Sequence, residues 1–282
     1  MWSLKGGYFM VAALKYILVP VAAAVGGVFC VAPKKASSEL KEPFRGRNFA
    51  HRGLYTEDQS IPENSLSAFA AAAEKGYGVE LDVHMTADEE IVVFHDDSLL
   101  RLCGEDRTIE SLTWEELSRY RLAGTEEKIP LLAEVFDTMG GLPVVLELKR
   151  RHDKQGPRLC EKTLALIRKY PGPVCVQSFD PTLVRWFRKH APDLLRGQLS
   201  GQTSHLKEDV PSPVAFLLSH CLTNFISRPN FISYRIGKKP LSVKISEKMG
   251  AMKVAWTSHN ESAEKKSDTV IFEHYLPNIR FK

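Results

Sequence analysis

Short apolar runs alternate with longer amphipathic stretches along most of the chain. Nine runs have the length and composition of strands, namely residues 48–51, 78–83, 91–95, 144–149, 173–178, 194–199, 230–235, 253–257 and 268–273. Helical patterns such as "SLSAFAAAAEK", "CEKTLALIRKY" and "PTLVRWFRKH" lie between most of them, and a Gly or Pro follows each within two residues. This alternation predicts an α/β fold built on a largely parallel sheet.

One connection between strand candidates is too short for a parallel crossover. Only the five residues "TADEE" separate Met85 from Ile91, whereas a crossover needs about a dozen. We therefore expect residues 91–95 to fold back antiparallel on residues 78–83. The eight other strands, spread over residues 48–282, match the size of a TIM (β/α)8 barrel. A doubly wound open sheet is the alternative, but the sequence lacks its Gly-rich phosphate loop.

The N-terminus contains a long apolar stretch. Val11–Ala32 carries a single charged side chain, Lys15, and about 20 apolar residues suffice to cross a bilayer. We expect an N-terminal transmembrane helix within residues 1–33, which would make the protein a single-pass membrane protein. A cleaved signal peptide ending near "CVA" is the alternative. Residues 34–47 are polar and are predicted to be a linker.

Charge and cysteine usage indicate in which cellular compartment the domain after the apolar stretch lies. Basic residues cluster after the apolar stretch, at Lys34, Lys35, Lys41, Arg45 and Arg47. The positive-inside tendency then places the domain in the cytoplasm. The five cysteines lack metal-ligand spacing and are expected to be small buried side chains in a reducing compartment. The net charge of +4 comes without Lys/Arg runs interleaved with aromatic residues, so nucleic-acid binding is not expected.

Acidic residues gather at the carboxyl ends of predicted strands, where the active sites of TIM barrels lie. Glu80 and Asp82 share one face of their strand, and Glu147 lies near the end of another. Carboxylate oxygens favour Mg²⁺, Ca²⁺ or Mn²⁺ over zinc. A salt-bridge network, with Lys149 beside Glu147 or Arg52 beside Glu80, is the alternative interpretation.

Two histidines also end predicted strands. His51 and His95 have the near-neutral pKa that suits a general base and a general acid. The neighbouring cations Arg52 and Lys149 are suited to holding the oxygens of a phosphate. Together with a metal, these groups indicate phosphoryl transfer or phosphodiester cleavage.

The ordered motifs "AHRG", "PENS", "ELDV", "VVFHD", "VLELK", "QSFDP" and "AWT" resemble the glycerophosphodiester phosphodiesterase family. The resemblance runs from about residue 48 to residue 260 and is weakest between residues 196 and 249. It implies a TIM barrel and hydrolysis of glycerophosphodiesters to an alcohol and glycerol 3-phosphate. One histidine would deprotonate water or the glycerol 2-hydroxyl, and the other would protonate the departing alkoxide.

Residue by residue, the resemblance implies Glu80, Asp82 and Glu147 as metal ligands, His51 and His95 as the acid/base pair, and Arg52 and Lys149 near the phosphate. Glu63 matches a polar rim position near the glycerol or the metal; alternatively it complements a helix start that Asn64 caps. Trp256 either lines the glycerol pocket or belongs to the core. His84 lies past the predicted strand end and is expected to be an ordinary polar residue.

Two segments depart from the family pattern. The closing "KKSDTVIFEHYLP" has no glycine before its strand, and "LLRLCGEDRTIE" lacks the usual Arg-Thr-Thr. Both suggest an altered substrate pocket. Besides glycerophosphodiester hydrolysis, two functions remain open: lysophospholipase D-like cleavage of lysophospholipids, and a non-catalytic barrel that binds lipid headgroups or acts as a scaffold. A binding protein has no need for two histidines at the rim, which favours an enzyme.

Overall fold

A computed structural model describes residues 25–149 and 154–282. Within these ranges it contains one nine-stranded sheet, made of β1 (Arg47–His51), β2 (Gly78–Met85), β3 (Ile91–Val93), β4 (Val144–Leu148), β5 (Val174–Ser178), β6 (Leu195–Ser200), β7 (Phe231–Arg235), β8 (Met252–Ser258) and β9 (Thr269–Phe272). Eight strands run parallel and close into a barrel, because β1 pairs with both β2 and β9. The predicted TIM-type barrel is confirmed, with each strand found within two residues of its expected ends.

The ninth strand forms the expected hairpin arm. β3 pairs antiparallel with β2, with Val93 opposite Val83 and Ile91 opposite Met85. β2 itself continues two residues further than predicted, so that His84 lies inside the strand rather than past its end. The ladder with β3 explains this extension, because it supplies hydrogen-bond partners beyond the barrel edge.

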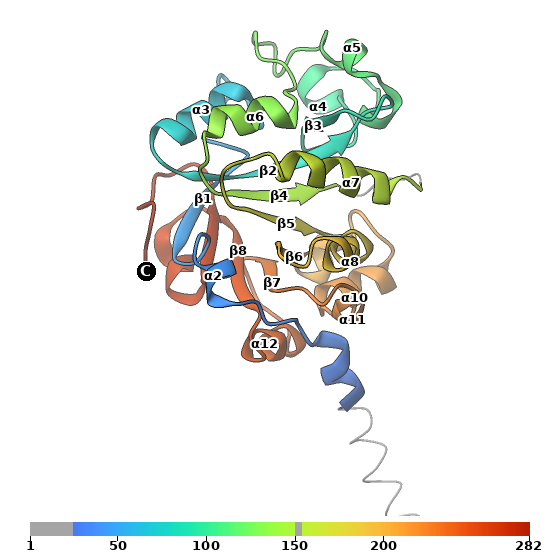
Figure 1. The fold of residues 1–282 in the computed structure, drawn as a ribbon, viewed down its shortest axis with the longest axis vertical. Coiled ribbons are helices and arrows are strands. Elements are labelled where there is room, and N and C mark those ends of the chain that lie inside the picture. Colours follow the sequence, from blue (N-terminus) through green and yellow to red (C-terminus); the bar gives the residue numbers. More distant parts are fainter. Residues whose placement is uncertain (1–24, 150–153) are drawn as a thin grey trace, which may run out of the picture.

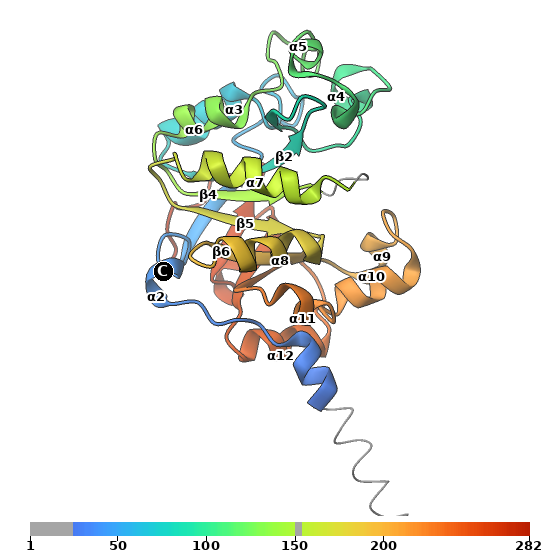
Figure 2. The ribbon, with the colours of Figure 1, turned by 45° about the vertical axis from the view of Figure 1, so that its right-hand side comes forward.

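Helices cover the outside of the barrel (Figure 1, Figure 2). Between the barrel strands lie α3 (Leu66–Glu74), α6 (Leu132–Met139), α7 (Gly156–Ile167), α8 (Pro181–His190), α12 (Leu241–Lys248) and η2 (Glu261–Lys266). Two insertions add short helices: α4 (Leu100–Cys103), η1 (Ile109–Ser111) and α5 (Trp114–Leu117) after β3, and α9 (Thr203–Leu206), α10 (Ser212–Ser219) and α11 (Asn224–Ser227) between β6 and β7. The helices predicted from the sequence correspond to α3, α7 and α8.

Side chains alternate between the outer and inner faces of each strand, so the barrel has two separate apolar regions. Val79, Leu81 and Val83 of β2 face outward into the core beneath the helices. The inward-facing residues of other strands, such as Phe49 and Phe231, fill the lower barrel. The same period of two turns Glu80 and Asp82 inward, toward the upper barrel. The apolar lower layer therefore supports a polar layer at the carboxyl ends of the strands.

Residues 34–47, predicted to be a linker, pack against the amino-terminal end of the barrel. They contain the short helix α2 (Ser38–Lys41), which Ser37 caps by accepting a hydrogen bond from the Leu40 amide. Phe44 is buried and stacks on Phe49, with ring centroids 6.0 Å apart. The apolar Phe44 side chain fills the end of the barrel and so holds this mostly polar segment in place.

The predicted transmembrane helix lies mostly within residues 1–24, outside the described residues. Residues 25–31 are helical. Across residues 25–149 and 154–282, no helix has both the length and the apolar content needed to cross a bilayer.

The lower barrel yields a packing prediction. A Cβ atom added at Gly197 would overlap the ring of Phe231. Gly197→Ala should therefore destabilise the protein by about 1–3 kcal/mol, measured by urea unfolding. The double variant Gly197→Ala/Phe231→Leu should recover part of that loss, because the smaller side chain makes room. An unchanged unfolding midpoint in Gly197→Ala would contradict this packing.

Candidate active site

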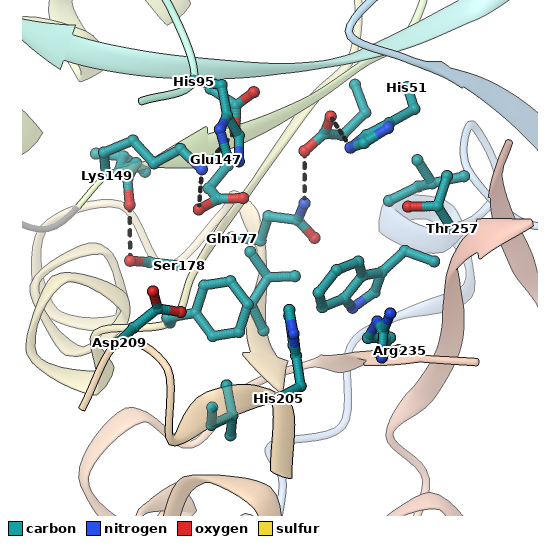
Figure 3. A pocket seen from close by; sticks show the side chains of 18 of the residues that line it. His51, His95, Glu147, Lys149, Gln177, Ser178, His205, Asp209, Arg235 and Thr257 are labelled. Carbon is teal, nitrogen blue, oxygen red and sulfur yellow. Dashed lines mark hydrogen bonds and ion pairs between the residues drawn. The ribbon is translucent and has the colours of Figure 1, made fainter. Parts of the chain in front are cut away.

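The carboxyl ends of the barrel strands surround a cavity of about 710 Å³. Eight of the predicted site residues line it: His51, Arg52, Glu80, Asp82, His95, Glu147, Lys149 and Trp256. Figure 3 shows His51, His95 and Glu147 gathered toward one end of the cavity, with His205 and Asp209 toward the other. The barrel thus brings together residues that are far apart in the sequence.

Three buried carboxylates meet at the barrel mouth. β2 and β4 are neighbours, with Asp82 directly opposite Glu147, and Glu80 lies on the same face as Asp82. One oxygen from each carboxylate lies within 4.8 Å of the others. Lys149 Nζ lies 2.8 Å from Asp82 Oδ1 and 2.9 Å from Glu147 Oε1. Gln177 Nε2 donates a hydrogen bond to Glu80 Oε1 at 3.2 Å.

Protein groups alone do not balance these charges. Burial and repulsion from Asp82 raise the pKa of Glu80 well above its usual value, and burial raises the pKa of Glu147 to about 7. Burial alone would also raise the pKa of Asp82, but attraction to Lys149 holds it well below its usual value. Glu80 Oε2 is buried without a hydrogen-bond partner in the described structure. Lys149 and Arg52, whose Nε lies 3.6 Å from Asp82 Oδ2, are two cations against three carboxylates. The remaining negative charge fits an oxygen-preferring divalent cation.

His51 is held by Glu273, a carboxylate that is not among the residues predicted from the sequence. Its Nδ1 lies 2.6 Å from Glu273 Oε2, and the Tyr55 hydroxyl donates to the same oxygen at 2.8 Å. Its Nε2 lies 3.9 Å from Glu80 Oε2. Burial lowers the pKa of His51, and the hydrogen bond to Glu273 opposes that effect. Because Nδ1 is engaged, Nε2 is the nitrogen left for proton transfer.

His95 is held in a similar way. Its Nδ1 lies 2.6 Å from Asp96 Oδ1, and Arg101 Nε donates to Asp96 Oδ2 at 2.6 Å. The two Arg101 Nη atoms donate to Glu63 at 2.9 and 2.7 Å. Glu63 in turn accepts from Arg52 Nη1 at 2.6 Å. Burial and repulsion from the Lys149 ammonium lower the pKa of His95 to about 4.

The "PENS" segment has a different local structure from the one suggested by its sequence. Ser65, not Asn64, caps α3, accepting a hydrogen bond from the Ala68 amide. The Asn64 side chain instead donates to Asp82 Oδ2 at 3.0 Å. Glu63 is buried and bonded to Arg52 and Arg101. The segment therefore orients charged groups of the site.

His84, expected to be an ordinary polar residue, is buried behind the site. Its Nε2 lies 3.4 Å from the carbonyl oxygen of His95. Burial and the nearby Lys149 lower its pKa to about 4, which favours the neutral ring.

The opposite wall of the cavity is largely apolar. Phe179, Leu206, Val210 and Leu218 line it, and three of these four belong to the insertion between β6 and β7. Trp256 also lines the cavity; its ring meets Phe179 edge-on at 5.8 Å, and its Nε1 donates to the Ser233 carbonyl at 3.1 Å. The cavity therefore has one end of charged groups and an opposite end where apolar side chains predominate, with the polar His205, Glu208 and Asp209 among them.

The family model described as the glycerophosphoryl diester phosphodiesterase family matches residues 51–273, well over half of the chain. The chain belongs to this family. It is 33% identical to a glycerophosphodiester phosphodiesterase of Caldanaerobacter subterraneus subsp. tengcongensis over 53% of this chain and 65% of that protein. It is 32% identical to human lysophospholipase D GDPD1 over 49% of this chain and 46% of that protein.

Solved structures of the family share the fold. A phosphodiesterase of Oleispira antarctica, determined with its product sn-glycerol-3-phosphate, superposes with a TM-score of 0.64 at 22% identity, covering 81% of this chain and 93% of that one. A Thermotoga maritima glycerophosphodiester phosphodiesterase superposes with a TM-score of 0.57 at 23% identity, covering 80% and 93%. At these identities the likeness supports the barrel itself.

The two segments that depart from the family pattern both reach the site. Glu273, within the closing segment, holds His51, and Arg101, in "LLRLCGEDRTIE", holds Asp96 and Glu63. One signal was available for Glu273, since it ends a predicted strand just as His51 does. Arg101 carried no comparable signal, because it lies in a loop-rich insertion.

We expect Glu273→Gln to lower the pKa of His51, because it removes the negative charge that stabilises the protonated ring. The limb of the kcat/KM profile that reports His51 should move to lower pH. Glu273→Asp keeps the charge and should shift the profile less. If all three proteins give the same pH profile, Glu273 does not act on His51.

Arg101→Lys should lower kcat/KM by up to about 100-fold, because a lysine ammonium cannot reproduce the four hydrogen bonds that the planar guanidinium makes to Glu63 and Asp96. The matched control is Arg119→Lys, since Arg119 is exposed and pairs only with the exposed Glu115 in the described contacts. Steady-state kinetics on both variants test this, alongside thermal unfolding to check folding. Equal activity of the two would show that Arg101 does not position the site.

Proposed function

We propose that this chain hydrolyses glycerophosphodiesters to an alcohol and glycerol 3-phosphate, using a divalent cation and two histidines. The observation that carries the proposal is the set of three buried carboxylates whose oxygens lie within 4.8 Å of one another. His51 and His95 line the same cavity. Phosphodiester cleavage can use each of these groups, whereas a protein that only binds a headgroup does not need the histidines.

The side chains divide the reaction between them. Arg52 and Lys149 lie on the cavity wall, where their charges hold the non-bridging oxygens of the phosphate. One histidine removes a proton from the nucleophile, which is water or the glycerol 2-hydroxyl. The other gives a proton to the departing alkoxide. Glu273 and Asp96 keep both rings oriented, with Nδ1 engaged and Nε2 available.

Glu80, Asp82 and Glu147 would hold the cation, which is Mg²⁺, Ca²⁺ or Mn²⁺ on the basis of their oxygen ligands. When bound, the ion supplies Lewis-acid stabilisation of the negative charge that develops on the phosphate. Lys149 already lies within hydrogen-bonding distance of two of the three ligands. It therefore contributes positive charge to the same oxygens.

Lysophospholipids are a second candidate substrate, favoured by the apolar wall of the cavity. Phe179, Leu206, Val210 and Leu218 lie across the cavity from the charged groups and suit an acyl chain. The human relative is named a lysophospholipase D. Both substrates would share the same phosphate, metal and histidine groups, and differ only in what contacts the apolar wall.

The apolar stretch at residues 11–32 supports a membrane-anchored enzyme with a single pass. Residues 48–282 would form the catalytic domain, on the cytoplasmic side, because basic residues follow the stretch. The alternative is a signal peptide that is removed. A protease added to intact cells should leave the barrel uncut if it is cytoplasmic.

Activity of the full chain in detergent should disappear in EDTA and return with Mg²⁺, Ca²⁺ or Mn²⁺, measured as choline release from glycerophosphocholine and from lysophosphatidylcholine. Glu80→Gln should lower turnover by at least about 100-fold, while Glu105→Gln, at an exposed position, should not. Turnover that persists in EDTA would exclude the metal. No turnover of either substrate with any of the ions would favour the non-catalytic barrel.

A further inference from the structure

Helix α10 is apolar on both of its faces. Ala215 and Leu218 face inward and pack with Leu206 of α9. Phe216 and Leu217 face outward and are 48% and 44% exposed. The outer face of a helix on a water-soluble domain normally carries polar side chains. The His220 ring packs 4.1 Å from that of Phe216, yet both outward residues stay nearly half exposed in the described part of the chain.

A second exposed apolar group lies on the next helix. Helix α11 follows α10 after a short turn and exposes Phe225. Phe29 stacks on Phe225, with ring centroids 6.5 Å apart, and is itself 59% exposed. Arg228 fixes this arrangement, because its Nη1 donates to the Phe29 carbonyl at 2.9 Å and its guanidinium lies 4.3 Å from the Phe29 ring centroid.

The polypeptide reaches α11 directly from the apolar N-terminal stretch. Val25 and Val28 are exposed, and residues 11–24 before them contain one charged side chain. Figures 1 and 2 both show residues 25–31 beside α11. Lys34 and Lys35 follow and are exposed, as expected where a chain leaves a bilayer and meets anionic headgroups.

We propose that the outer faces of α10 and α11, together with the adjoining helix, dock on a lipid bilayer. This docking face consists of Val25, Val28, Phe29, Val214, Phe216, Leu217 and Phe225. A bilayer fits the face better than a protein partner, because Val25, Val28 and Phe29 belong to the apolar stretch of residues 11–32, which is long enough to cross a bilayer. Its side chains would enter the headgroup and acyl boundary by about 5–10 Å.

Docking would also determine how the cavity is oriented relative to the membrane. The inner face of α10 supplies Leu218, and the preceding turn supplies Val210, to the apolar wall of the cavity. With its outer face on lipid, α10 would bring that wall to the membrane surface. A lysophospholipid could then enter the cavity without its acyl chain crossing water. This consequence rests on the proposed function, whereas the docking itself does not.

The test uses the full chain in vesicles of phosphatidylcholine and phosphatidylglycerol, with or without dibrominated acyl chains. Bromine quenches tryptophan emission only on contact within the acyl region. Phe216→Trp should lose emission in brominated vesicles beyond the loss shown by the unsubstituted protein. Leu100→Trp is the matched control, because Leu100 is equally apolar and 57% exposed, but lies on α4 in the other insertion. Its added emission should not be quenched.

If Phe216→Trp stays unquenched while the protein floats with the vesicles, another protein or a second copy covers this face and the proposal is wrong. Equal quenching at both positions would also overturn it. A second measurement uses Phe216→Ser/Leu217→Ser, which should lower turnover of vesicle-borne lysophosphatidylcholine by about 10-fold per side chain. Turnover of water-soluble glycerophosphocholine should not change. If neither substrate is hydrolysed, the proposed function fails while the quenching result still decides the docking.

Discussion

The site depends on three carboxylates forced together in a buried layer at the barrel mouth. Glu80 and Asp82 share a strand face, and the neighbouring strand places Glu147 opposite Asp82. Lys149 is shared between two of them, and burial together with repulsion from Asp82 raises the pKa of Glu80 well above its usual value. Such a cluster is costly unless a further positive charge joins it. The apolar lower layer of the barrel therefore supports a carboxylate arrangement that suits a cation.

Around this cluster, each histidine is oriented by a carboxylate that is not part of the cluster. Glu273 comes from the end of the last barrel strand, and Asp96 follows the hairpin arm. Arg101 joins Asp96 to Glu63, and Glu63 accepts from Arg52. One chain of charge-assisted hydrogen bonds thus links His95 to Arg52, which we propose to hold the phosphate. Long charged side chains held at both ends lose little further freedom when a substrate binds, which favours preorganisation.

The two insertions shape the two ends of the cavity. The one after β3 provides Arg101 to the charged end of the cavity, and the one after β6 provides the apolar end. The second insertion also turns apolar side chains outward beside the N-terminal helix. One short helix can thus contact a bilayer on one face and shape the substrate cavity on the other.

Local pattern in the sequence determined the strands, the hairpin and the face on which Glu80 and Asp82 lie, because a side-chain period of two and a five-residue turn leave few alternatives. Only the tertiary structure decided which side chains of the site interact with one another. Glu273 meets His51 across 222 positions because barrel closure sets β9 beside β1. Asn64 bonds to Asp82 instead of capping α3, and Arg101 reaches the site from the short helix α4. Such pairs depend on strand order and register, which local sequence does not encode.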